Sequence, residues 1–210
     1  MGKEGVFMNT LLGSPASFAL LAALAFFIIV LFRIRRIRFT TRLLTHISLA
    51  VALTVVLHMI RLYHMPQGGS VTPGSMIPLL LISLWHGPEA GYLGGFIFGV
   101  INMLQDPYIL HPVQVLFDYP LPYMALGLAG YFAGHPYAGA LAGVTGRFLC
   151  HYISGIVFFA SYAPTGMSPY WYSLVFNATY LVPELLVCLF ILKLLPLERI
   201  YCQSTGGRNQ

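Results

Sequence analysis

The stretch SFALLAALAFFIIVLFRIRRIRFTTR, residues 17–42, joins an uncharged apolar run to a dense cluster of arginines. The run has the length of one membrane helix, and the basic residues follow it: Arg33, Arg35, Arg36, Arg38 and Arg42. A secretory signal carries its positive charges before the apolar run, and positive residues flank membrane helices on the cytoplasmic side. The stretch therefore predicts a retained membrane helix whose N-terminus lies outside and whose basic end faces the cytoplasm.

The composition of the whole chain agrees with a membrane protein. Of its 210 residues 58% are hydrophobic and 8% are charged, and the mean hydropathy is +0.77. A soluble domain carries charge on roughly a quarter of its residues, whereas a chain of this length has room for about six or seven membrane spans. The net charge of +5 is concentrated in the arginine cluster between apolar spans, with no aromatic-rich basic groove. This distribution argues against nucleic acid as a partner.

We predict an all-α integral membrane protein, and the expected spans are residues 16–34, 41–62, 76–87, 89–105, 112–133, 137–161 and 172–196. The segment PQGGSVTPGS, residues 66–75, is too polar and glycine-rich for contact with lipid. Irregular backbone at membrane depth occurs only beside protein or a water-filled cavity. We therefore expect this segment to be a loop that folds over an outward-facing cavity. The tail, residues 199–210, carries Arg199 and Arg208 and is expected in the cytoplasm.

Asp118 lies within the apolar span 112–133, where an ionised carboxylate is costly and normally faces the interior with a partner. Gln114, four residues earlier, shares its helical face, and Tyr119 follows directly. Two readings stay open from the residues alone. Asp118 either forms a structural pair with Arg147, the basic residue deep in a later span, or serves as the counter-charge of a cationic ligand.

The last two spans carry further polar and aromatic residues on single helical faces. His151 and Phe159 lie near a glycine gap, and either plain packing or a ligand pocket accounts for them. Asn177 both donates and accepts hydrogen bonds, which suits the edge of a heteroaromatic ring, and Glu184 on the same face is deeper and has a structural interpretation. No nucleophile with its base, no Cys/His metal spacing and no phosphate-binding loop with its lysine is present. We predict no enzyme, no metal and no cofactor.

Three stretches together carry a family resemblance: MPQGGSVTPGSMIPLLLISLWHG, then HPVQVLFDYPL with LGLAG, and HYISGIVFFASYAPTG with YSLVFNATYLVP. In order and spacing they are similar to the thiamine-specific substrate-binding subunits of energy-coupling factor (ECF) transporters, the ThiT or YuaJ-like family. The similarity covers roughly residues 40–195. It implies a six-helix bundle that binds thiamine from outside, closed by the loop after its first helix, with one additional helix at the N-terminus of this chain.

The resemblance also implies which side chains meet the ligand. The family positions fall on Asp118, Tyr119, His151, Tyr172, Asn177, Tyr108 and Gln114. Relatives can carry tryptophan where this chain has Phe98 and Phe159, and also in the lid, here Gly68, Gly69 and Ser70. Phenylalanine still offers a π-face to a cation, although a weaker one than tryptophan.

The family works with partners, so the resemblance implies a transmembrane coupling subunit and two ATPase subunits, with Ser48 and Ala52 as a small-residue docking face. It divides the chain into an extra helix with its anchor at 1–39, a thiamine-binding domain at 40–198 and a cytoplasmic tail at 199–210, in the plasma membrane. The rival hypotheses are a self-sufficient proton-coupled carrier that uses Asp118, His151 or Glu184, an intramembrane enzyme, and a binding subunit for a thiamine precursor or another cationic vitamin.

Overall fold

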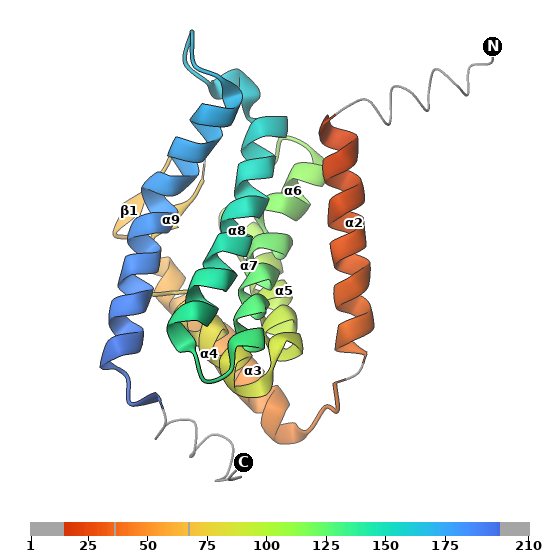
Figure 1. The fold of residues 1–210 in the computed structure, drawn as a ribbon, viewed down its shortest axis with the longest axis vertical. Coiled ribbons are helices and arrows are strands. Elements are labelled where there is room, and N and C mark those ends of the chain that lie inside the picture. Colours follow the sequence, from red (N-terminus) through yellow and green to blue (C-terminus); the bar gives the residue numbers. More distant parts are fainter. Residues whose placement is uncertain (1–14, 36, 67, 198–210) are drawn as a thin grey trace, which may run out of the picture.

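The computed structural model describes residues 15–35, 37–66 and 68–197. The helices are α2 (Pro15–Ile34), α3 (Thr41–Met59), α4 (Ile77–His86), α5 (Pro88–Gln105), α6 (Pro112–Asp118), α7 (Pro120–Ala125), η1 (Leu126–Phe132, a 3-10 helix), α8 (Pro136–Phe158), η2 (Ala160–Tyr162, also 3-10) and α9 (Pro169–Leu194). The strands β1 (Tyr63–His64) and β2 (Ser70–Val71) form one short hairpin. The helices stand side by side as an elongated bundle (Figure 1). The predicted all-α architecture is confirmed.

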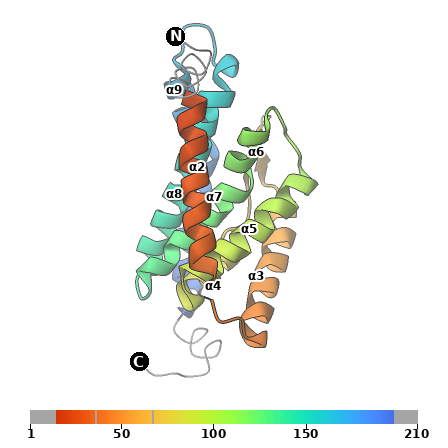
Figure 2. The ribbon, with the colours of Figure 1, turned by 90° about the vertical axis from the view of Figure 1, so that its right-hand side faces the viewer.

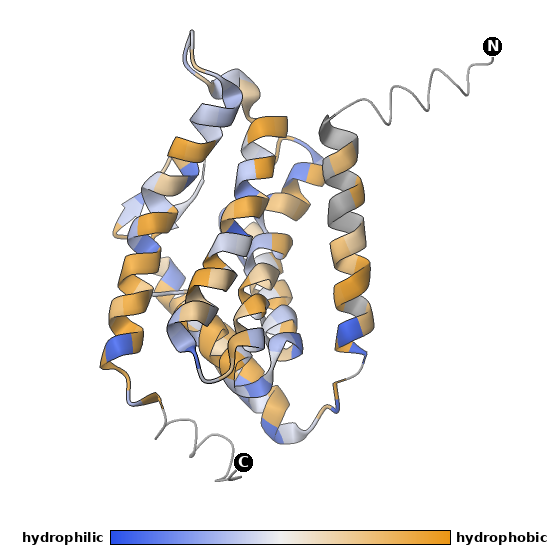
Figure 3. Ribbon diagram, viewed as in Figure 1, coloured by the Kyte–Doolittle hydropathy of each residue, from blue (hydrophilic) through white to orange (hydrophobic). Residues whose placement is uncertain are grey.

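Within the described residues, α3, α8 and α9 are long and apolar enough to cross a membrane, and α4 and the C-terminal half of α2 are shorter apolar segments. Large apolar side chains point outward along these helices, among them Leu49, Val56, Leu141, Leu149, Leu186 and Phe190. Figure 3 shows hydrophilic lower ends on α2 and α9, whose last turns contain Arg33 and Lys193. The exterior is thus apolar along the shaft and charged at one end.

The expected continuous helix over 112–133 is wrong, because this segment consists of α6, α7 and η1 in succession. Pro120 has no N–H to donate and disfavours helical backbone at the residue before it, so α6 ends at Asp118. Tyr119 takes up the break with φ −117° and ψ −78°, and α7 starts at Pro120. The break leaves Asp118 at the end of a short helix instead of in the middle of a span.

Close contact between α5 and α7 depends on the glycines of AGYLGGFIFG. A Cβ atom on Gly95 would overlap the backbone of Tyr123, and one on Gly99 would overlap the backbone at Tyr119 and Pro120. Small residues at helix interfaces let membrane helices approach closely. These glycines therefore permit the close packing that holds the α6–α7 break against α5.

Helix α2, the additional N-terminal helix, packs along α5, α6 and α8 (Figure 2). Val30 is buried in an apolar cluster with Tyr92 and Phe117, flanked by Phe26 and Phe27. At the basic end of the helix, Arg33 lies 3.7 Å from Glu89. This packing leaves the outer face of α3 uncovered, where both Ser48 and Ala52 are exposed. Arg36 lies outside the described residues.

The segment expected to be an irregular lid loop contains the β1–β2 hairpin, in which Tyr63 pairs with Val71 and His64 with Ser70. Its turn uses Gly68 and Gly69, whose φ values of +90° and +92° favour glycine. The Nδ1 atom of His64 lies 2.9 Å from the Ser70 hydroxyl. The hairpin is thereby ordered as a compact flap between α3 and α4.

Candidate ligand-binding site

A pocket opens beneath the hairpin, enclosed by α3, α5, α6, α8 and α9. Its wall includes nearly all of the predicted ligand-binding and lid residues: Asp118, Tyr119, His151, Phe159, Tyr172, Asn177, Tyr108, Gln114, Gly68, Gly69 and Ser70. Phe98 is the exception. Its ring is fully buried and lies behind the wall, edge-on to Tyr123 at 4.5 Å and to His58 at 5.4 Å between centroids.

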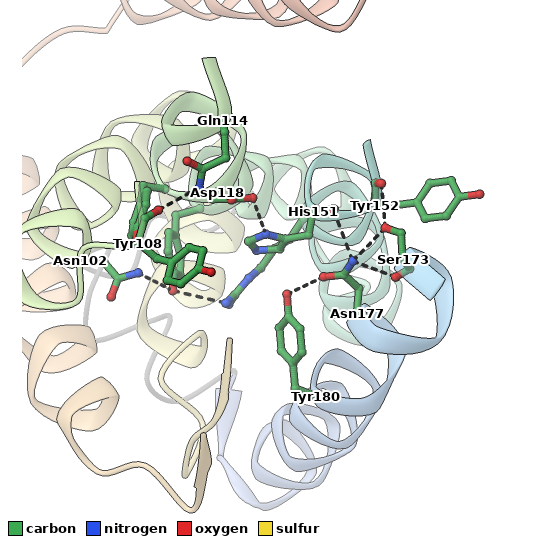
Figure 4. A network of polar contacts seen from close by, with 12 residues as sticks. Asn102, Tyr108, Gln114, Asp118, His151, Tyr152, Ser173, Asn177 and Tyr180 are labelled. Atoms are coloured by element: carbon green, nitrogen blue, oxygen red, sulfur yellow. Dashed lines mark hydrogen bonds and ion pairs between the residues drawn. The ribbon is translucent and has the colours of Figure 1, made fainter. Parts of the chain in front are cut away.

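Asp118 lies at the centre of a network of polar contacts in the pocket (Figure 4). Gln114 Nε2 donates to its Oδ2 over 2.5 Å, and His151 Nδ1 lies 3.4 Å from its Oδ1. The side chain retains 17% exposure, on the pocket side. Neither lysine nor arginine pairs with Asp118 in the described part of the chain, so a neutral His151 leaves its negative charge uncompensated.

Gln114 and Tyr119 hold the turn between α5 and α6. Gln114 Oε1 accepts from Leu110 N at 3.0 Å, and its Nε2 also donates to the carbonyl of Tyr108 at 3.0 Å. The Tyr119 hydroxyl donates to the carbonyl of Asp106 at 2.8 Å and accepts from Tyr108 N at 2.6 Å. These side chains are occupied within the protein, so their principal effect is to fix Asp118 and the pocket mouth.

On the other side of the pocket, α8 and α9 are joined through Asn177. Its Nδ2 donates to the carbonyls of Ser173 at 2.8 Å and of His151 at 3.3 Å, and its Oδ1 accepts from the Tyr180 hydroxyl at 2.9 Å. Gly155 permits this approach, because a Cβ atom there would overlap the Ser173 side chain. His151 Nε2 is buried without a hydrogen-bond partner in the described structure, which leaves one polar position for a ligand.

Aromatic rings form the outer part of the wall. Tyr108 and Phe159 stack with centroids 5.9 Å apart and an interplanar angle of 22°, and Tyr172 lines the same cavity. The Tyr108 hydroxyl lies 2.8 Å from that of Tyr162 at the mouth, and this hydrogen bond raises the pKa of Tyr108 above its usual value. Stacked rings of this kind favour a flat aromatic ligand.

Arg147 pairs with Glu184, and no ion pair joins it to Asp118 in the described part of the chain, so the structural pair considered from the sequence is not formed. Arg147 Nη1 lies 3.9 Å from Glu184 Oε2, and both side chains are almost fully buried. The guanidinium also lies over the Tyr123 ring at 4.4 Å. Glu184 Oε1 accepts from Thr72 at 2.7 Å and from Ser75 at 3.2 Å, so it connects α9 to the base of the lid.

The residue patterns did not single out His58, Asn102 or Tyr123, which also line the pocket. Buried atoms without hydrogen-bond partners in the described structure include His58 Nδ1 and Asn102 Oδ1. The sequence carries only a weak signal for His58: it is four residues from Thr54, on the buried face of α3. This spacing indicates a polar face on the helix but does not show which other helices that face contacts. Among the described residues, no group of three His, Cys, Asp or Glu side chains is arranged to hold a metal ion.

An outward-apolar helical bundle with an enclosed pocket of aromatic and polar side chains defines a multi-pass membrane protein built to hold a small solute. The chain belongs to the family described as "Thiamine transporter protein (Thia_YuaJ)", whose profile matches residues 44–203. The resemblance found in the three motifs is thereby confirmed. Because this is a family of transporters, membership also confirms that the chain is not an enzyme.

Similar proteins support this family assignment. The thiamine transporter ThiT of Bacillus subtilis (strain 168) is 36% identical over 171 residues, which cover 72% of this chain and 88% of the relative. ThiT of Lacticaseibacillus paracasei is 27% identical over 122 residues, covering 49% and 61% of the two chains. A solved structure of ThiT from Listeria monocytogenes superposes with a TM-score of 0.67 at 24% identity, covering 75% of this chain and 93% of that one, and thus has the same fold.

Proposed function

We propose that this protein captures thiamine from outside the cell as the substrate-binding subunit of an ECF-type, ATP-driven importer. The observation that carries the proposal is the charge state of the pocket. Of the two carboxylates that line it in the described part of the chain, Asp106 is neutralised by Arg61 at 2.9 Å. Asp118 has only Gln114 and His151. A permanently cationic thiazolium supplies the missing counter-charge.

The remaining contacts suit the two rings of thiamine. Phe159, Tyr108 and Tyr172 provide aromatic faces for stacking. His151 Nε2 and the free lone pair of Asn177 Oδ1 accept hydrogen bonds from an exocyclic amine. Burying such groups without a partner costs about 1–3 kcal/mol each, so ligands that lack the amine are rejected. The lid residues Gly68, Gly69 and Ser70 then close over the bound ligand.

Transport requires partners, and here the proposal extends the family resemblance. The exposed face of α3 with Ser48 and Ala52 is the docking surface for the transmembrane coupling subunit, which acts with two ATPase subunits. Residues 40–198 form the thiamine-binding domain in the plasma membrane, and residues 1–39 add the extra helix and its basic anchor. The tail 199–210, which lies outside the described residues, is cytoplasmic in this topology.

Titration calorimetry of the detergent-solubilised protein with thiamine tests the binding step. Heat of binding that saturates at one thiamine per chain supports it, whereas a folded protein that binds no thiamine refutes it. A thiamine precursor or another cationic vitamin bound more tightly would reassign the solute. For the coupling step, proteoliposomes with and without the coupling and ATPase subunits are compared. Uptake driven by a pH gradient alone, without those subunits, would establish the proton-coupled carrier instead.

A further inference from the structure

The pocket contains a cation that is unexpected in a site for a cationic ligand. Arg147 lines the wall together with Asp118 and His151, and its side chain is 3% exposed. A buried arginine repels a second positive charge over several ångströms, because the protein interior screens poorly. Unless something compensates it, Arg147 would cancel the attraction that Asp118 exerts.

Glu184 is the compensating group. It lies on the same face of α9 as Asn177 and Tyr180, one turn further from the mouth, and it does not itself line the pocket. Its Oε2 lies 3.9 Å from Arg147 Nη1 and has no hydrogen-bond partner in the described structure. Its other oxygen is held by Thr72 and Ser75 at the base of the lid. The carboxylate is thus fixed by one oxygen and faces the guanidinium with the other.

We infer that Glu184 is a specificity-determining residue: by neutralising Arg147, it keeps Asp118 as the one uncompensated charge among the described residues that line the pocket, and so selects a cationic over a neutral ligand. This inference rests on the proposed function, because it concerns how the same pocket chooses its solute. Glu184 acts through Arg147 and does not touch the ligand. Its effect is therefore on the charge preference of the site, not on the shape of the site.

The expected effect follows from Coulomb's law. Loss of the Glu184 charge removes a negative charge that lies beyond Arg147, about 12 Å from the ligand cation, and at an effective dielectric constant of about 20 this weakens binding by about tenfold. A neutral ligand of the same shape feels almost none of this, so its affinity changes by less than about threefold. The ratio of the two affinities therefore falls by about threefold or more when Glu184 loses its charge.

The experiment compares Glu184→Gln with the wild type and with Thr72→Val as a matched control. Each protein is titrated calorimetrically with thiamine and with a neutral isostere, in which carbon replaces the positively charged ring nitrogen. Glutamine keeps an acceptor for Thr72 and Ser75 but removes the charge. The control removes one lid hydrogen bond to Glu184 Oε1 and leaves the charge in place. We expect the affinity ratio to fall in Glu184→Gln and to stay within about twofold of the wild type in Thr72→Val, on the Coulomb estimate above.

The outcomes separate this inference from the function on which it rests. A wild type that binds thiamine, with a ratio unchanged in folded Glu184→Gln, would overturn the role of Glu184 and leave the function intact. A folded wild type that binds no thiamine would overturn both. If Glu184→Gln does not fold, the double variant Arg147→Gln/Glu184→Gln decides, because it removes both charges of the pair. A ratio that rises by no more than about threefold supports the inference, and a larger change overturns it.

Discussion

Replacing Asp118 with Asn isolates the charge of the proposed counter-ion. Asparagine is nearly isosteric and retains an oxygen that accepts from Gln114 Nε2, so the network around α6 keeps its shape. The aspartate side chain is 17% exposed, which justifies an effective dielectric constant of about 20. At a spacing of about 5 Å between carboxylate and thiazolium, the interaction amounts to about 3 kcal/mol. We expect the Kd for thiamine to rise by about two orders of magnitude.

The assay is calorimetric titration of the purified, detergent-solubilised variant, with thermal unfolding to verify the fold. Asp106→Asn is the matched control, because Asp106 lines the same pocket but pairs with Arg61 and is 39% exposed. A partly exposed pair contributes about 0–1 kcal/mol, so its loss raises the Kd by less than about fivefold. A folded Asp118→Asn variant that binds thiamine like the wild type would refute the counter-charge argument. An equal loss for the neutral isostere would also refute it.

Three further predictions concern the lid, the mouth and the extra helix. Gly69→Ala places a Cβ about 2.8 Å from the Tyr180 ring, so we expect thiamine to dissociate about tenfold faster in stopped-flow fluorescence, on the scale of overpacking. Gly68→Ala is the control, because Gly68 has a similar φ but open space around it, and it should have the smaller effect. Equal dissociation rates for the two variants would argue against contact between the lid and Tyr180. Tyr108→Phe should change the Kd for thiamine by less than about threefold, whereas Tyr108→Ala removes a stacked ring and should weaken binding by about tenfold. If calorimetry gives the reverse order, the hydroxyl matters more than the ring. Deleting residues 1–39 should lower the Tm but change the Kd for thiamine by less than about threefold, because the described part of α2 does not line the pocket and distant sites act independently. Loss of thiamine binding by a folded truncated protein would contradict this prediction.

Local spacing predicted much of the fold and part of the site. Gln114 and Asp118 are four residues apart, and the structure joins them by a hydrogen bond within one helix. Asn177 and Tyr180 likewise share a face of α9 and bond to each other. These relationships need only helical periodicity. The positions of the helices could also be read from the apolar runs, apart from the division of 112–133.

Relationships between distant segments could not be read in the same way. From the sequence we considered only Asp118 as an acidic partner of Arg147, whereas the structure pairs Arg147 with Glu184. Phe98 was placed in the pocket by analogy, yet its ring lies behind Tyr123. Asn102 lines the pocket because the glycines let α5 pack closely against α7. The position of Asn102 in the pocket therefore depends on tertiary packing, which the sequence of α5 alone does not reveal. In each case the deciding distance joins helices far apart in the chain.

The position of α2 has a consequence for how the protein is made. Its buried ring contacts are with α5 and α6, which leave the ribosome only after α3 and α4 have been synthesised. Membrane helices first insert separately and then associate. During synthesis α2 must therefore remain in the bilayer as a lone helix, anchored by its arginines, until its partners arrive. A helix made before its neighbours thus docks only once they are in place, and biogenesis must protect it in the interval.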